Sequence, residues 1–350
     1  MKRKLQIAAG ISLGLFLVWF VFRGTDWGKV YQAVRGAGWG WLALCEILCL
    51  LSFVTRVQRW GYIVRTAKPV SFRHMFSATQ IGFLANFVLP GRVGEVIRAL
   101  VLSRLTWLPF SRCFAFVVLD RVTDLFGLMA VLLVSVAAFH PQSAIILPAE
   151  IYASPIPASV IRTAAMMTGL AIVLLVGFFV LLYLNQRLVL RLANACLRVI
   201  SPRLAAKTGE LLQHFADGLH VFRSAGDMSK SIGFSLVTWS TFILVYAAMF
   251  EAFDLDWPWY APFVCNSLLA VAISLPGAPG FVGQFHIAIV GGLLIVMPNV
   301  DLDVAKAVAI VAHILNLAPV VLVGVYCLYR EQFGLMELQH QSETAQESTP

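Results

Sequence analysis

The sequence predicts an all-α, polytopic membrane protein, and three observations lead to that prediction. Hydrophobic residues make up 59% of the 350 residues and charged residues only 13%, whereas soluble domains carry about 25% charged residues. The mean hydropathy is +0.82. Apolar runs of roughly 18 or more residues, long enough to cross ~30 Å of hydrocarbon, recur along the chain. Too few polar side chains remain to cover a soluble globule.

Six apolar runs are predicted to be complete spans. The first follows Met1-Lys2-Arg3-Lys4, and because no small-x-small cleavage site comes after it, we expect an uncleaved span and not a signal peptide. The predicted spans are residues 5–22, 41–58, 113–138, 163–184, 231–252 and 304–328.

Two further apolar stretches, residues 75–105 and 260–297, are interrupted by proline and glycine. The breaks fall at Leu89-Pro90-Gly91 and at Pro276-Gly277-Ala278-Pro279-Gly280. Proline removes a backbone donor and ends a helix, and each half, at about 14–17 residues, is short for a crossing. We therefore expect two re-entrant helical hairpins, although two complete crossings at each stretch would give the same overall orientation.

The two halves of the chain form an internal repeat. Residues 90–95 read Pro-Gly-Arg-Val-Gly-Glu and residues 279–284 read Pro-Gly-Phe-Val-Gly-Gln. Each motif lies in the third element of a half, over residues 5–138 and 163–328, and the predicted hairpins enter from opposite faces. This is an inverted-topology repeat, typical of transporters, within a single domain of residues 1–330.

The basic residues predict the orientation. With the N-terminus inside, most of the 26 Lys and Arg fall in cytoplasmic segments, among them Arg56, Arg59 and Arg98. This bias predicts an inner or plasma membrane protein with both termini in the cytoplasm. The net charge of +8 is therefore explained by the basic cytoplasmic segments and does not indicate nucleic-acid binding. Residues 187–230 are expected to form a basic cytoplasmic segment, either lying on the leaflet or packed on the spans. Residues 331–350 are expected to be a polar, disordered tail.

Charged residues within the apolar stretches mark a candidate site, because charge inside hydrocarbon is costly. Arg92, Glu95 and Arg98 follow the first break at helical spacing, and the next span carries another group. That group is Asp120, Arg121 and Asp124. Two hypotheses stay open: a purely structural ion-pair network, or a polar cavity that binds a lipid headgroup.

The hairpin tips favour the second hypothesis. A helix that begins near Arg92 would present free N–H groups to an anion, and its glycines would let a ligand approach the backbone. The second tip repeats this arrangement, although a lone histidine such as His286 is more often a core residue. The predicted substrate-binding residues are Asn86, Gly91, Arg92, Gly94, Glu95, Arg98, Asp120, Arg121, Asp124, Pro279, Gly280, Gly283, Gln284 and His286.

No motif indicates a cofactor, a metal or a catalytic group. The sequence contains no Walker A motif, no HExxH zinc site and no GxSxG elbow. The cysteines have no CxxC or metal-ligand spacing, so we expect free, buried thiols. They are Cys45, Cys49, Cys113, Cys196, Cys265 and Cys327.

The motifs together resemble the lysylphosphatidylglycerol synthase transmembrane-region family, a group of flippase-like membrane domains. The resemblance rests on Asn86-x-x-x-Pro90-x-Arg92-x-Gly94-Glu95-x-x-Arg98, Asp120-Arg121-x-x-Asp124 and Pro279-Gly280-x-x-Gly283, and covers residues 5–330. Two positions depart from the family pattern: Gln284 stands where an acid is common, and Asp120 where Glu often precedes the arginine. The chain ends about 20 residues after its last span, so we expect no synthase domain.

The resemblance implies translocation of a phospholipid or polyprenyl-phosphate-linked molecule between leaflets, without enzymatic activity. Two alternatives remain. The chain could be an intramembrane enzyme that uses Glu95, Asp120 and Asp124 as acid and base groups. It could also be a non-transporting partner of a separately encoded lipid-modifying enzyme. The lipid itself and the oligomeric state are not predicted.

Overall fold

The computed structural model describes residues 2–89, 93–141, 144–146, 154–200, 225–275 and 277–347. Within these ranges the regular structure is helical, apart from one isolated bridge between Ile145 and Ile156. The elements are α1 Lys2–Phe22, α2 Trp27–Gly36, α3 Trp39–Val64, α4 Phe72–Val88, α5 Gly94–Thr106, α6 Phe110–Ala138, α7 Ala158–Leu184, α8 Gln186–Ile200, α10 Ala225–Ala252, α11 Ala261–Ser274, the 3₁₀ turn η1 Pro279–Phe281, α12 Gln284–Val296, α13 Leu302–Arg330 and α14 Leu335–Glu347.

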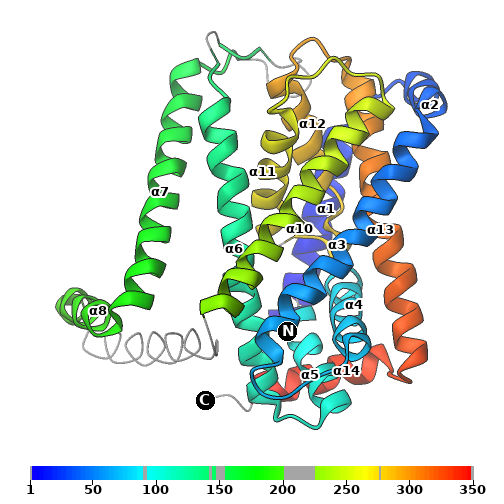
Figure 1. The fold of residues 1–350 in the computed structure, drawn as a ribbon. Helices are drawn as coiled ribbons and strands as arrows, with labels where there is room; N and C mark the ends of the chain where they lie inside the picture. The colour runs from blue at the N-terminus through cyan, green and yellow to red at the C-terminus, as the bar shows by residue number, and fades with distance from the viewer. Residues whose placement is uncertain are drawn as a thin grey trace.

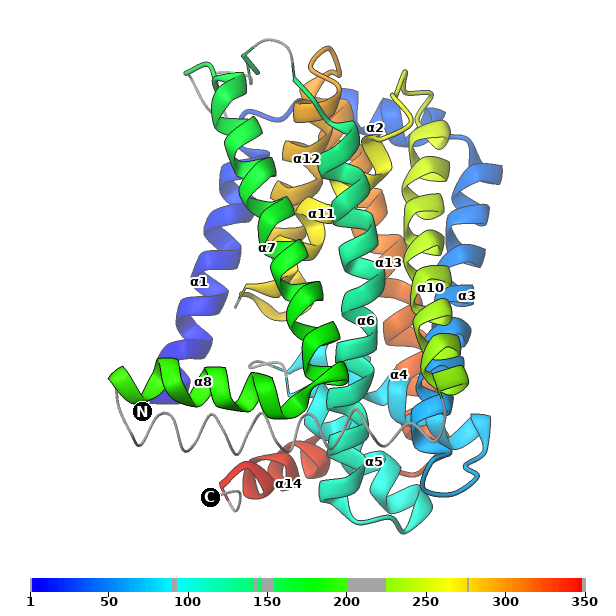
Figure 2. The same ribbon diagram turned by 60° about the vertical axis from the view of Figure 1, so that its left-hand side comes forward.

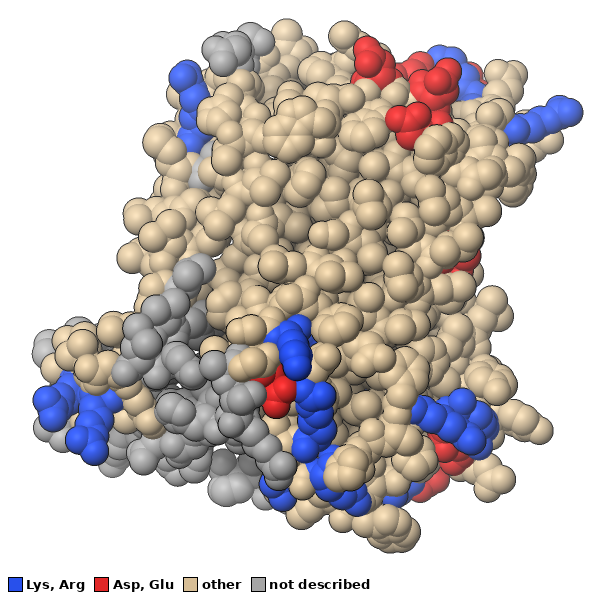
Figure 3. Space-filling view, in the orientation of Figure 1, with Lys and Arg blue, Asp and Glu red and all other residues tan. Residues whose placement is uncertain are grey.

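The chain is an all-α, polytopic membrane protein, as predicted. Each of the six predicted spans corresponds to a long helix, in order α1, α3, α6, α7, α10 and α13 (Figure 1). By length and composition, five described stretches could cross a membrane: Trp39–Val64, Ala158–Leu175, Gly226–Ala252, Pro279–Val296 and Leu302–Arg330. On the face shown in Figure 3, a band with few charged side chains crosses the middle of the molecule, and most charged side chains lie toward its two ends.

The two interrupted stretches form the short helix pairs α4/α5 and α11/α12. The residue before each first proline is extended, Leu89 at ψ 141° and Leu275 at ψ 149°, because proline disfavours helix in the residue that precedes it. The stretch Pro279–Val296 contains non-helical backbone at Gly280 and at Gly283. Its regular helix is therefore the 13 residues of α12, about 20 Å long at 1.5 Å per residue.

The two pairs occupy opposite ends of the bundle. Helices α4 and α5 lie in the lower half and α11 and α12 in the upper half, while α3, α6, α10 and α13 run through both (Figures 1 and 2). The start of α1 and helix α14 both lie at the lower end (Figure 2). This placement is the one that an inverted pair of hairpins requires; their re-entry into a membrane stays a prediction.

Two hydrophobic cores, one per half, hold the bundle together. The upper core is built from α1, α10, α11, α12 and the first parts of α3 and α13, with Cys49, Met249 and Ile289 among its members. The lower core is built from α4, α5, α6 and the later part of α3, with Trp60 and Ile97 among its members. The middle of the bundle lies between these cores.

The polar segments of the chain differ from expectation in one place. The tail, expected to be disordered over 331–350, forms α14, whose Leu338 is fully buried in the lower core. Arg104 on α5 binds Glu337 at 3.0 Å, so a tertiary contact orders a segment whose composition alone is polar. The basic segment 187–230 begins with α8, which lies across the bundle axis below α7 (Figure 2); its residues 201–224 lie outside the described ranges.

Candidate functional site

A cavity of about 360 Å³ lies at mid-height, between the two cores. Along α3 it is lined by Ser52, Phe53 and Arg56, which separate Cys49 of the upper core from Val57 of the lower core. Along α13 it is lined by a group around Asn316, the middle residue of that 29-residue helix. Helix centres lie deepest in a membrane that the bundle crosses. Because these helices are the predicted spans, we expect the cavity near the bilayer midplane.

The cavity wall is charged on one side and apolar on the other. Helices α4, α5 and α6 contribute Asn86, Glu95, Arg121 and Asp124, and α3 contributes Arg56. The rest of the lining is mainly apolar and aromatic, with polar groups at Asn266, Ser274, His313 and Asn316. The apolar wall formed by α10, α11, η1, α12 and α13 comprises Val245, Leu269, Ala270, Ile273, Phe281, Phe285, Pro319 and Val320, while Phe242 lies beside Arg56 and Leu128 lies on α6. Small-molecule sites have this composition and volume.

Asn86 joins the two arms of the first helix pair. Its Oδ1 accepts a hydrogen bond from the backbone N–H of Gly94 at 2.8 Å, and its Nδ2 donates to both carboxylate oxygens of Glu95, at 3.3 and 3.4 Å. The first contact satisfies a free N–H at the start of α5. Gly94 is required here, because a Cβ at this position would overlap the carbonyl oxygen of Gly82 on α4.

Helix α6 supplies the ion pairs. Arg121 binds Glu95 of α5 at 2.7 Å and approaches Asp124 at 3.8 Å. Asp120, which is 1% exposed, accepts from Arg98 at 2.7 Å. The sequence placed these acidic and basic residues in two separate helices, and the structure brings them together in one network.

Arg59, like Arg56 in the cavity lining, is a residue that the sequence analysis did not assign to the site. Its Nε donates to Asp120 at 2.8 Å, and its Nη1 binds Asp124. The charge bias counted Arg56 and Arg59 among the cytoplasmic basic residues, at the end of the predicted span 41–58. In the structure α3 continues to Val64, the side chain of Arg59 is only 1% exposed, and Arg56 lines the cavity. Two arginines within a continuous apolar helical run are the signal that could have identified it.

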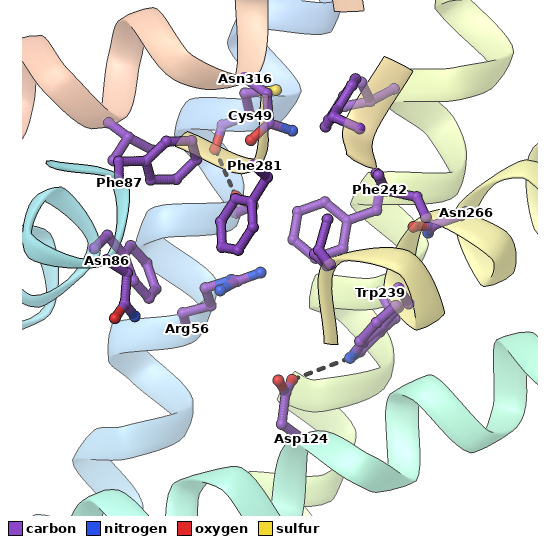
Figure 4. A pocket seen from close by; sticks show the side chains of 18 of the residues that line it. Cys49, Arg56, Asn86, Phe87, Asp124, Trp239, Phe242, Asn266, Phe281 and Asn316 are labelled. Atoms are coloured by element: carbon purple, nitrogen blue, oxygen red, sulfur yellow. Dashed lines mark hydrogen bonds between the residues drawn. The ribbon is translucent and has the colours of Figure 1, made fainter. Parts of the chain in front are cut away.

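Aromatic residues complete the network. The indole N–H of Trp239 on α10 donates to Asp124 at 3.0 Å, as Figure 4 shows at the cavity wall. The guanidinium of Arg98 lies 3.7 Å from the ring centroid of Trp60. Stacking of this kind stabilises a buried cation through the ring quadrupole. The network thus extends over α3, α5, α6 and α10.

The second helix pair meets the first at the cavity. The rings of Phe281 and Phe87 are in edge contact at 5.4 Å (Figure 4), and Nε2 of His313 donates to the carbonyl of Gly280 at 2.8 Å. Gly280 has φ +68° and Gly283 has φ +84°, a region that side chains disfavour. The two tips therefore face each other, as the predicted site requires.

The predicted site residues fall into three groups. Those that line the cavity are Asn86, Glu95, Arg121 and Asp124. Those that do not line it but lie in the helices or turns around the two pairs and α6 are Gly94, Arg98, Asp120, Pro279, Gly280, Gly283, Gln284 and His286. Gln284 donates to the carbonyls of Ala272 and Leu275 and so holds the second pair together, and His286 packs on Phe22 and His313. Gly91 and Arg92 lie outside the described residues.

The described cysteines and acidic residues form no metal centre. Cys45, Cys49, Cys113, Cys265 and Cys327 are buried and unbridged, and the side chain of Cys196 is not among those described. Among the residues that the structure describes, no group of three or more His, Cys, Asp or Glu side chains could hold a metal ion. The chemistry of the site rests on its arginines and carboxylates.

These features define a class: a helical membrane protein with a part-charged cavity between two opposed helix pairs. The chain belongs to the lysylphosphatidylglycerol synthase TM region family, whose profile matches residues 7–324. The resemblance drawn from the motifs is thereby confirmed.

Two curated proteins are similar to the chain at low identity. A UPF0104 membrane protein of Methanothermobacter thermautotrophicus is 24% identical over 334 residues, which cover 93% of this chain and 92% of that protein. A protein of Haloferax volcanii named Glycosyltransferase AglD is 24% identical over 344 residues, covering 92% of this chain and 54% of the relative. The chain spans about half the length of the second protein.

Proposed function

We propose that this protein moves a phospholipid or a polyprenyl-phosphate-linked molecule between the leaflets of an inner or plasma membrane. One observation carries the proposal: a cavity at the middle of the bundle with a charged wall facing an apolar one. An amphipathic lining suits an amphipathic ligand, whose headgroup needs polar partners within the hydrocarbon. The two opposed helix pairs are the arrangement that transporters with inverted repeats use.

The comparisons support the choice of ligand. The family's description refers to a synthase of a modified phospholipid, and one relative is named a glycosyltransferase. Both names are compatible with handling of a lipid or a lipid-linked sugar, and we extend that class to this chain.

Transport fits the site better than catalysis. Glu95, Asp120 and Asp124 could serve an enzyme as acid or base groups, but each of them binds an arginine in the structure. A carboxylate whose oxygens already bind an arginine is less available to act on a substrate. A role as the partner of a separate lipid-modifying enzyme is the other alternative, and it requires no lipid exchange.

The test is leaflet exchange of a labelled phospholipid in vesicles that contain the purified protein. Ala270 on α11 lines the cavity, and its neighbour Val271 is 55% exposed on the outer face of the helix. We expect Ala270→Trp to fill the cavity and abolish exchange, and Val271→Trp to leave it unchanged. Recovery of the labelled lipid in unmodified form would show that the protein does not modify that lipid during exchange. Equal exchange by both variants and the wild type would contradict the proposal.

A further inference from the structure

Arg56 differs from every other arginine of the central network. Its guanidinium lies between two rings, 5.1 Å from the centroid of Phe83 and 4.8 Å from that of Phe242. Within the part of the chain that the structure describes, it makes no hydrogen bond or ion pair, and its Nε is buried without a partner. Figure 4 shows the side chain reaching into the cavity. Arg59, one helical turn further on, is bound by two carboxylates.

A charge count explains why this matters. The described network contains three arginines, Arg59, Arg98 and Arg121, which bind three carboxylates, those of Glu95, Asp120 and Asp124. These six groups sum to zero. Arg56 is then one positive charge in excess, at a depth where an uncompensated charge is costly. A bound anion of charge −1 would offset it.

We propose that Arg56 binds the phosphodiester group of a net-anionic lipid. This deepens the proposed function and rests on its premise that a lipid enters the cavity. A phosphodiester carries a single negative charge, and the planar guanidinium fork can bind two of its oxygens at once. Phe83 and Phe242 hold the fork in place by cation–π contacts. The apolar wall opposite, with Leu269 and Ile273, contacts the start of the hydrocarbon chains.

The surplus charge also predicts selectivity. A lipid of net charge −1, such as phosphatidylglycerol, neutralises the cavity as a whole. Phosphatidylcholine carries the same phosphodiester but adds a positive ammonium, which the excess charge disfavours. Inorganic phosphate has the anionic group without the chains, so the apolar wall contributes nothing to its binding.

The experiment measures the affinity of the full chain, purified in detergent, for short-chain phosphatidylglycerol, short-chain phosphatidylcholine and inorganic phosphate. We expect Arg56→Gln to weaken phosphatidylglycerol binding about ten- to a hundredfold, the value of a charge-assisted hydrogen bond, and to remove the preference over phosphatidylcholine. Arg56→Lys keeps the charge without the fork and should lose less. Arg65→Gln is the matched control, since Arg65 ends the same helix and stacks on Tyr62 outside the cavity lining.

The melting temperature gives an independent check on folding. Arg56→Gln loses the cation–π contacts with Phe83 and Phe242 but no hydrogen bond or ion pair, and it removes an uncompensated charge from the interior. The variant should therefore melt at or above the wild-type temperature in the absence of lipid. A clearly lower melting temperature, unchanged phosphatidylglycerol affinity, or equal affinity for inorganic phosphate would each overturn the proposal. If lipid binding depends on Arg56 but the protein shows no leaflet exchange, this inference stands and the proposed transport function falls. If the protein exchanges lipid but binding does not depend on Arg56, the transport function stands and this inference falls.

Discussion

The most demanding prediction concerns Arg59, whose substitution by glutamine should destabilise the fold. Arg59 joins α3 to α6 by binding Asp120 at 2.8 Å and also Asp124. Both it and Asp120 are 1% exposed. Glutamine keeps much of the side-chain volume but removes the charge, so the two carboxylates lose their shared partner and stay buried.

The expected loss of stability follows from the partners that Asp120 and Asp124 keep when Arg59 is replaced. Asp120 keeps only its contact with Arg98, and Asp124 keeps Arg121 at 3.8 Å and the indole of Trp239. Removing one partner of a buried ion pair costs about 3–5 kcal/mol. Exposed pairs contribute about 0–1 kcal/mol. We therefore expect Arg59→Gln to lower the free energy of unfolding by about 3–5 kcal/mol.

The assay is equilibrium unfolding of the full chain in mixed micelles, titrated with a denaturing detergent. Arg65→Gln is the control: its side chain is 45% exposed and binds Asp227 at the helix end, so the loss should stay within about 1 kcal/mol. A double-mutant cycle with Asp120→Asn isolates the pair. If Arg59→Gln costs no more than the control, the carboxylates are held by other means and the network described here is not the one that stabilises the bundle.

Two further predictions concern the helix pairs. Gly94→Ala should separate α4 from α5 and lower the melting temperature, because its Cβ would overlap backbone atoms. Gly291→Ala, whose Cβ would have nothing within 4 Å, should not lower it. Equal melting temperatures for the two variants would refute the close approach of α4 and α5. For the proposed topology, single cysteines replacing Ser71 and Trp107, at the two outer ends of the first pair, should react with an impermeant thiol reagent from the cytoplasmic face. A cysteine replacing Asn299 should react from the opposite face. Labelling of the Ser71 and Trp107 positions from different faces would mean that the first pair crosses the membrane once, and would contradict the proposed topology.

Local properties of the sequence determined most of the secondary structure. The length of an apolar run and the presence of proline act on the residues that carry them, so the six long helices and the breaks after Val88 and Ser274 follow from the sequence alone. The same holds for the charged groups within α5 and α6, which their cost in hydrocarbon marks as a site.

Which of these charges meet was decided by the tertiary structure. Arg59 stands about 60 residues before its carboxylate partners on α6, and no local pattern indicates that Arg59 is ion-paired while Arg56 is not. Leu338 likewise orders a polar tail only because α5 and the lower core are present to cover it. Pairing, burial and the cavity itself depend on distances between helices far apart in the sequence, and only the packing of the two cores sets those distances.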